Sequence, residues 1–213
     1  MRCISRRLLV SSTIAGAVLF SAGIPALAQT KAQSAPSSQA AQAAQVEELL
    51  SKQAITELLY KYPRALDRLD RELLLSIGHP EAKVEFGKTV FPNWTAYTDW
   101  MMKAHGEMEG NNHRITNILI EVKGDTAVSE STGTATLLVK KEGRDDLYEE
   151  RWMHSRYLDK WSRRNGKWGL DSRVTVMDYR RVLDVPASIV KSGYVMGPRT
   201  GRDDPSYKFF GAH

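Results

Sequence analysis

The sequence predicts an α+β domain, with about three helices in its first part followed by a strongly curved, mostly antiparallel sheet that wraps over them. Two observations lead to this fold class. Apolar residues recur at helical spacing before His113, and from His113 onward they alternate with polar residues as in half-buried strands. Because the strand-like segments are long and joined by short turns, the sheet is expected to be a meander.

Three helices are expected before the strands. The first begins at Val46, and its apolar residues fall on one face: Leu49, Leu50, Ile55, Leu58, Leu59 and Tyr62. Pro63 lacks a backbone donor, so it is expected to kink this helix or to restart it. A short helix over 72–77 follows, which Gly78 can end. Asn93 can cap a third helix, whose apolar face carries Trp94, Tyr97, Met101 and Ala104.

The strands of the expected sheet come next, at 114–122, 127–139, 147–161 and 168–179. The pair Asn165–Gly166 is the strongest hairpin signal in the chain, since both residues tolerate the positive φ that a two-residue turn needs. Gly124 marks an earlier turn. The tail from Val185 onward is expected to be rich in loops.

Residues 1–28 are predicted to be a cleavable export signal. They contain three arginines near the start, then an apolar run, then the small-x-small pattern Ala26–Leu27–Ala28 that a signal peptidase needs. The run is too short and too diluted with Ser, Thr and Gly for a membrane anchor, so no membrane contact is expected after cleavage. The protein is therefore expected in the periplasm. The pair Arg6–Arg7 leaves both the Sec and the twin-arginine route open.

The composition excludes several classes of function. Residues 29–45 are rich in Gln, Ala and Ser and predict a disordered linker before one domain over 46–213. The formal charge of +5 falls to +2 without the signal's arginines, too little for a nucleic-acid partner. The single cysteine, Cys3, leaves with the signal, so neither a disulfide nor a reactive thiol is expected. No spacing of His, Cys or acidic residues suggests a metal site.

A series of spaced motifs covers most of the chain from Ile55 to Tyr207. The motifs are YPRALDRLD at 62–70, HPEA at 79–82, HRITN at 113–117, GDTA at 124–127, RYLDKW at 156–161, GKW at 166–168 and DPSY at 204–207. Together they resemble the SnoaL-like branch of the NTF2-like superfamily. The resemblance implies a cone of curved sheet and helices that holds a small apolar ligand, and chemistry without metal or cofactor. Its members include dehydratases, isomerases and aromatic lyases, as well as non-catalytic proteins.

The resemblance also implies site residues. Asp67 matches an aspartate on the family's first long helix, and His113 matches a histidine at the start of a central strand. Tyr62 and Arg173 match a tyrosine and an arginine of the bile-acid dehydratases. An imidazole oriented by a buried carboxylate can remove a proton from substrate, and a phenol such as Tyr62 or Tyr60 can return one. Alternatively, His113 bonds a backbone carbonyl, and Asp67 forms a salt bridge with Arg64 or Arg71.

Two further residues of the first helix are candidates for substrate binding, together with Arg173. Tyr60 and Arg64 lie near the helix face that carries Asp67, so the guanidinium could meet an anionic or phenolate group. His105 closes the third expected helix, where the helix dipole alone favours a histidine.

These features predict a cofactor-independent lyase, either a dehydratase or a deformylating lyase, or less readily an isomerase. Its substrate would be a small, apolar, aromatic molecule of the lignin-derived type. The alternative is a periplasmic binding module that uses the same cone without chemistry. A homodimer is expected, or a trimer, formed through the open face of the sheet with 147–161 as the candidate surface.

Overall fold

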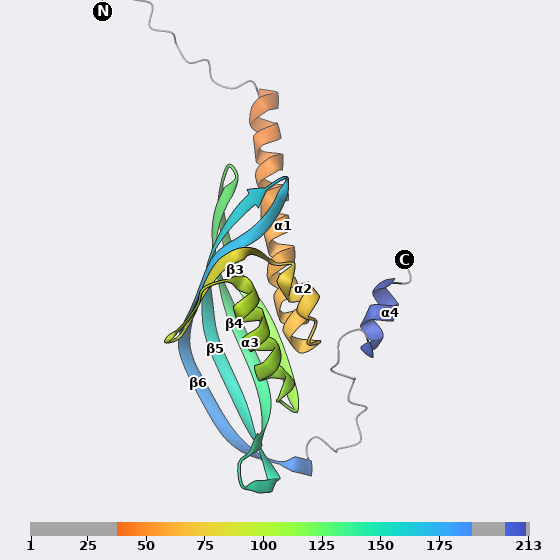
Figure 1. Cartoon of the computed structure of the whole chain (residues 1–213). Helices are drawn as coiled ribbons and strands as arrows, with labels where there is room; N and C mark the ends of the chain where they lie inside the picture. Colours follow the sequence, from red (N-terminus) through yellow and green to blue (C-terminus); the bar gives the residue numbers. More distant parts are fainter. Residues whose placement is uncertain (1–37, 189–202, 212–213) are drawn as a thin grey trace, which may run out of the picture. The chain divides into compact units, whose positions relative to one another are not determined.

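The computed structural model describes residues 38–188 and 203–211 (Figure 1). The expected export signal and the beginning of the expected linker lie outside these residues. The elements in chain order are α1 (Ser38–Asp67), α2 (Arg71–Leu75), β1 (Gly78–Phe86), β2 (Thr89–Phe91), α3 (Trp94–Gly106), β3 (Gly110–Lys123), β4 (Thr126–Lys141), β5 (Arg144–Arg164), β6 (Lys167–Pro186) and α4 (Pro205–Gly211). In this described part, no helix combines the length and the apolar character needed to cross a membrane.

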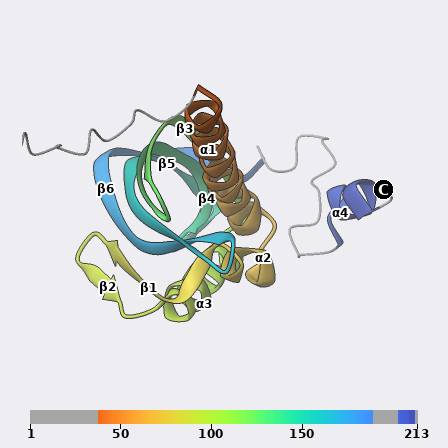
Figure 2. The same cartoon turned by 90° about the horizontal axis from the view of Figure 1, so that it is seen from above.

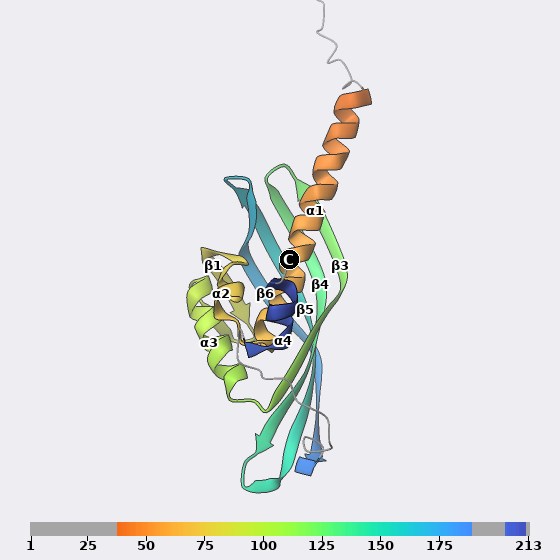
Figure 3. The same ribbon diagram turned by 90° about the vertical axis from the view of Figure 1, so that its right-hand side faces the viewer.

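The strands form one six-stranded sheet in the order β2-β1-β6-β5-β4-β3. All neighbouring strands are antiparallel except β1 and β6, which are parallel. The long strands curve, and helices α1, α2 and α3 lie on the inner side of the curve (Figures 2 and 3). There α1 packs against β3 and α3 against β1. The predicted α+β cone with a curved, mostly antiparallel sheet is confirmed.

Helix α1 differs from the expectation at both of its ends. It is already helical at Ser38, although 29–45 was expected to be a disordered linker, and 38–50 is exposed throughout. Ala and Gln are good helix formers, so they extend a helix that the core stabilises further along. Leu49 and Leu50 are consequently exposed rather than buried.

The expected restart of the first helix at Pro63 is wrong. The helix continues through the proline to Asp67. Only about one turn follows Pro63, so the missing backbone donor costs a single bond near the helix end. Pro63 is itself buried, and the packing of its ring offsets that loss.

The other two helices follow the sequence more closely. Asn93 caps α3 as expected, its side-chain oxygen accepting a hydrogen bond from the Ala96 backbone N–H at 2.8 Å. Helix α2 stops at Leu75, and Gly78 begins β1 instead of ending the helix. The reason for this glycine is tertiary: a Cβ at Gly78 would lie 2.7 Å from the ring of Trp94.

The expected long strands are β3 to β6, all four longer than their sequence patterns. Asn165 and Gly166 form the β5–β6 turn with φ of 51° and 77°, as a two-residue hairpin turn requires. The short pair β1 and β2 was not anticipated, because only Ala82 and Val84 of β1 show a buried alternation. Most of the tail that was expected to be rich in loops lies outside the described residues, and its described part contains α4.

Candidate functional site

The end of α1 and the beginning of β3 bring Asp67 and His113 into contact. The imidazole Nδ1 of His113 lies 2.7 Å from Oδ1 of Asp67. The carboxylate also accepts the His113 backbone N–H, at 3.0 Å and 3.2 Å from its two oxygens. Both side chains are about nine-tenths buried, with 8% and 10% of their surface exposed. The ion pair with Arg64 or Arg71 considered for Asp67 is not formed: Arg71 pairs with Asp99.

His113 lines a cavity of about 170 Å³ between α3 and the inner face of the sheet. The residues around it are mostly apolar and include four methionines, Met101, Met108, Met153 and Met177. The polar side chains in the lining are His105, His113, Ser155 and Tyr157. Because the Asp67 carboxylate contacts the His113 imidazole and this imidazole lines the cavity, the arrangement suits proton transfer to or from an apolar ligand.

His105 is a site residue that the sequence analysis explained by the helix dipole alone. It is buried in the last turn of α3, and its Nδ1 lies 2.9 Å from the Met101 carbonyl oxygen. Its Nε2 lies 3.3 Å from Nε2 of His113. The sequence gives only a weak signal of this contact. The two histidines stand on either side of the turn between α3 and β3, and only the folded turn brings their rings together.

Tyr157 is the second residue of the cavity that the sequence analysis did not single out. Its ring lies directly on Gly133 of β4, where a Cβ would come within 2.3 Å of the ring carbon Cε2. Glycine at this position thus leaves room for the ring beside the cavity. Ser155, Tyr157, Asp159 and Trp161 occupy every second position of β5, and all four are buried. This alternation is the sequence pattern that could have identified Tyr157 as an inward-facing residue.

Tyr62, the expected acid, lies behind the cavity and does not line it. It is fully buried, and its hydroxyl is 2.5 Å from that of Tyr97. Its ring meets Tyr157 edge-on at 5.6 Å between centroids. Burial and the neighbouring phenol of Tyr97 raise the pKa of Tyr62 well above its usual value. Because α1 directs Tyr62 into the core, Tyr157 is the phenol closer to a bound ligand.

Arg173, expected to bind substrate, is committed to a buried ion pair. Its guanidinium donates two hydrogen bonds to the carboxylate of Asp159, each 2.8 Å long. It also lies over the rings of Tyr62 and Tyr157, at 4.3 Å and 4.2 Å from their centroids. Burial alone would lower the pKa of Arg173, but the Asp159 carboxylate raises it above the ordinary value. Arg173 supports the tyrosines and is absent from the cavity lining.

Tyr60 and Arg64 lie away from the cavity as well. Tyr60 is 55% exposed. Arg64 donates to the Ser206 hydroxyl at 3.1 Å and lies over the ring of Tyr207, both near α4. Because α1 continues through Pro63, its buried face carries Leu59, Tyr62 and Leu66 and turns Tyr60 and Arg64 outward. Neither residue lines the inner cavity.

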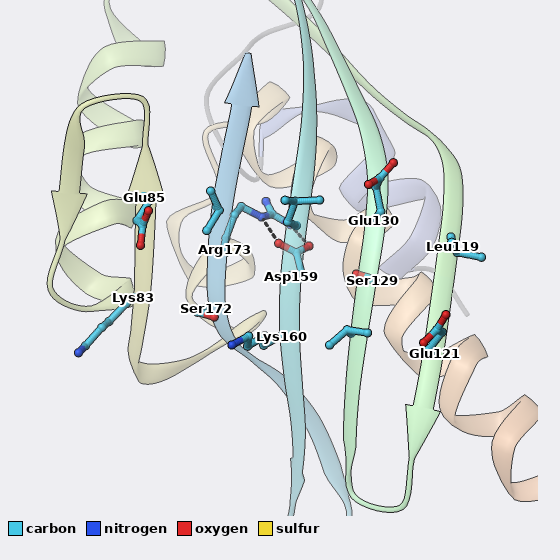
Figure 4. Close-up of a pocket in the computed structure, with 13 residues that line it drawn as sticks. Lys83, Glu85, Leu119, Glu121, Ser129, Glu130, Asp159, Lys160, Ser172 and Arg173 are labelled. Carbon is cyan, nitrogen blue, oxygen red and sulfur yellow. Dashed lines mark hydrogen bonds and ion pairs between the residues drawn. The ribbon is translucent and has the colours of Figure 1, made fainter. Parts of the chain in front are cut away.

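A second, larger hollow of about 580 Å³ lies on the outer face of the sheet (Figure 4). Charged and apolar side chains of five strands line it, among them Lys83, Glu85, Leu119, Glu130 and Lys160. The pair of Asp159 and Arg173 borders it but is almost fully buried. No histidine lines this hollow, so the smaller inner cavity is the one equipped for acid–base chemistry.

A family model described as a SnoaL-like domain matches residues 47–174. The chain belongs to the SnoaL-like family. The matched segment contains Asp67, His105, His113 and Tyr157, so the titratable residues of the inner cavity fall within the SnoaL-like domain. A search of curated proteins gave no match.

Solved structures share this SnoaL-like fold. A hexachlorocyclohexane dehydrochlorinase of type 2 is 20% identical with a TM-score of 0.59, over 72% of this chain and 97% of that one. A type 3 dehydrochlorinase from Novosphingobium barchaimii is 20% identical with a TM-score of 0.57, over 72% of this chain and 99% of that one. A putative scytalone dehydratase from Novosphingobium aromaticivorans is 20% identical with a TM-score of 0.56, over 64% of this chain and 90% of that one. At 20% sequence identity, these similarities show a shared fold and carry no statement about activity.

Proposed function

We propose that this SnoaL-like protein is a cofactor-independent lyase, a dehydratase or a deformylating lyase, acting on a small aromatic molecule. The observation that carries the proposal is the contact between Asp67 and His113 at the wall of an apolar cavity. The dehydratase and dehydrochlorinase among the solved structures with this fold carry names that denote eliminations. The family thus supports lyase chemistry, and the aromatic substrate is proposed from the size and lining of the cavity.

The dyad supplies the base. The Asp67 carboxylate can only accept at the His113 Nδ1, so it fixes the tautomer that leaves Nε2 able to take a proton. When the imidazolium forms, the adjacent carboxylate stabilises it beside a mostly apolar cavity lining. Both proposed reactions begin with such a proton transfer, from carbon in a dehydration and from a hydroxyl in the loss of formaldehyde.

The cavity limits the size and character of the substrate. A dry cavity of about 150 Å³ holds one benzene ring, so about 170 Å³ accommodates one aromatic ring with small substituents. Methionine sulfur makes favourable contacts with aromatic rings and adapts to their shape. The four methionines of the lining therefore favour an aromatic ligand over a sugar or a charged metabolite.

The proposal is tested with the mature chain from Gln29 onward and a panel of single-ring aromatic alcohols, without added cofactor and with a chelator present. Mass spectrometry of the products distinguishes loss of water from loss of formaldehyde. His113→Gln is the matched loss-of-base variant, and His154→Gln is the control, because His154 stacks on Tyr179 away from the cavity. Ligands that bind without turnover would instead support the non-catalytic binding module.

We further propose that this reaction takes place in the periplasm. The proposal rests on the export signal expected in residues 1–28. Its test is cell fractionation with an antibody against the mature domain, and protein retained in the cytoplasmic fraction would contradict it.

A further inference from the structure

His105 and His113 present four ring nitrogens, and their neighbours define the protons on two of them. The Nδ1 of His105 faces the Met101 carbonyl oxygen, which can only accept, so this nitrogen carries a proton. The Nδ1 of His113 faces the Asp67 carboxylate and carries a proton for the same reason. The two remaining nitrogens, both Nε2, face each other at 3.3 Å.

Two bare lone pairs at this separation repel, whereas one proton between them makes a hydrogen bond. We propose that the two histidines share this proton, and that His105 is the general acid of the reaction for which His113 is the base. The pair then consists of one imidazole and one imidazolium. The inference rests on the proposed lyase function, to which it adds the group that protonates the leaving oxygen.

The charges around the pair agree with a single shared proton. The titratable groups of the cavity lining are His105, His113 and Tyr157, and Asp67 lies behind His113. The other lining residues are apolar apart from Ser155. One carboxylate and one imidazolium leave this buried cluster without net charge, which an apolar surrounding favours over an unpaired ion.

The elimination can then be written with every proton accounted for. When the substrate binds, the hydrogen bond between the two Nε2 atoms opens, and the Nε2 of neutral His113 takes a proton from substrate carbon. The electrons of the broken C–H bond form the new double bond. The C–O bond breaks as the leaving oxygen takes the proton of His105, and water is formed. His113 is then the imidazolium and His105 the imidazole. The proton passes between the two Nε2 atoms and restores the starting state, so each turnover consumes and releases no net proton.

The arrangement also indicates the stereochemistry. The base and the acid lie side by side in one cavity, so they approach the substrate from the same side. The proton and the oxygen should therefore leave from the same face, in a syn elimination. Tyr157, which lines the cavity with them, is left to orient the ring or the leaving group.

The first experiment tests the shared proton in the ligand-free protein and does not depend on any activity. Nitrogen-15 spectra of the histidine rings at neutral pH should show protonated Nδ1 on both His105 and His113 and one proton divided between the two Nε2 atoms. In His105→Gln, the Nε2 of His113 should lose this shared proton. Two fully neutral rings, or binding of Zn²⁺ alone between the two Nε2 atoms in a parallel titration, would overturn the inference.

The second experiment separates an acid from a structural residue by changing the leaving group. For a substrate that loses water, His105→Gln should lower kcat by about a hundredfold or more. For the same substrate with a halide in place of the hydroxyl, which leaves without a proton, the variant should lose much less. Equal losses on both substrates would rule out the acid role. If the wild type turns over neither substrate, the dehydratase form of the lyase proposal fails, and the spectra still decide the proton sharing.

Discussion

The carboxylate of Asp67 holds His113 at two points, the imidazole Nδ1 and the backbone N–H of the same residue. The first contact orients the ring, and the second attaches β3 to the last residue of α1. A side-chain amide of Asn111, which donates to the Leu66 carbonyl at 3.1 Å, reinforces this junction. Orientation of the base and docking of the helix are thus linked through one side chain.

The first prediction concerns this dyad. Asp67→Asn keeps an acceptor for the backbone N–H but removes the charge that stabilises the imidazolium, so turnover should fall by about a hundredfold or more. His113→Ala should have a similar effect. The double variant should be little worse than either single one, because the two residues act as a unit. Steady-state kinetics with circular dichroism as a folding check measure this, and additive losses would contradict it.

The second prediction concerns the space beneath Tyr157. Gly133→Ala places a methyl group 2.3 Å from the ring, so the ring must move and the variant should lose about 1–3 kcal/mol of stability. Gly110→Ala is the matched control in the neighbouring strand, since its nearest contact would be an ordinary 3.6 Å. Urea denaturation of both variants gives the comparison. Equal stabilities would mean that the Tyr157 ring is not held against β4.

The third prediction concerns the buried ion pair. Arg173→Ala leaves Asp159 charged and unpaired in the core, so the free energy of unfolding should fall by about 3–5 kcal/mol. The double variant Arg173→Met with Asp159→Leu should recover much of that loss. The control is Arg156→Ala, which removes an exposed pair with Asp178 and should cost about 1 kcal/mol or less. Chemical denaturation measures all three.

The fourth prediction is a loss of stability in alkali. Burial is the main cause that raises the pKa of Tyr62, Tyr97 and Tyr157, and neighbouring phenols add to it. In the unfolded chain these phenols ionise near pH 10. A raised pKa in the folded state means that the stabilisation is complete below about pH 10 and is lost as the pH rises further. Each phenol should contribute a slope of about 1.4 kcal/mol per pH unit.

The measurement is urea denaturation at a series of alkaline pH values, with tyrosinate absorbance recorded in parallel. Tyr97→Phe removes one of the three buried phenols, so its slope should be smaller by about 1.4 kcal/mol per pH unit. A slope unchanged by this substitution would show that Tyr97 already ionises in the folded protein.

The fifth prediction concerns assembly. We propose that the outer hollow pairs with a second copy of this chain, because its surface combines apolar residues with both signs of charge. Leu119, Val128 and Leu158 are 64%, 48% and 38% exposed there, between lysines and glutamates that can meet their opposites across a two-fold axis. Leu158→Arg should halve the mass seen by light scattering. Val90→Arg, on exposed β2 outside the hollow, should not. A wild-type monomer at high concentration would refute the pairing.

Local chemistry made parts of this molecule readable from the sequence. Asn93 caps α3 and Asn165–Gly166 turns the chain because both depend on backbone geometry within a few residues. The alternation along β3 to β6 reports which side chains face inward, because successive side chains of a strand point to opposite faces. The contact between Asp67 and His113 was anticipated through the family resemblance, since spacing alone cannot bring a helix end to a strand 46 residues away.

The sequence by itself thus determined the order of the first three helices and the four long strands, the faces of those strands and two members of the candidate site. Only the tertiary structure decided which phenol reaches the cavity, because the missing Cβ of Gly133 admits Tyr157 while α1 buries Tyr62 behind it. It also decided that His105 meets His113, which depends on how the turn after α3 places the two rings. These outcomes depend on packing between segments distant in the chain, and no local pattern encodes that packing.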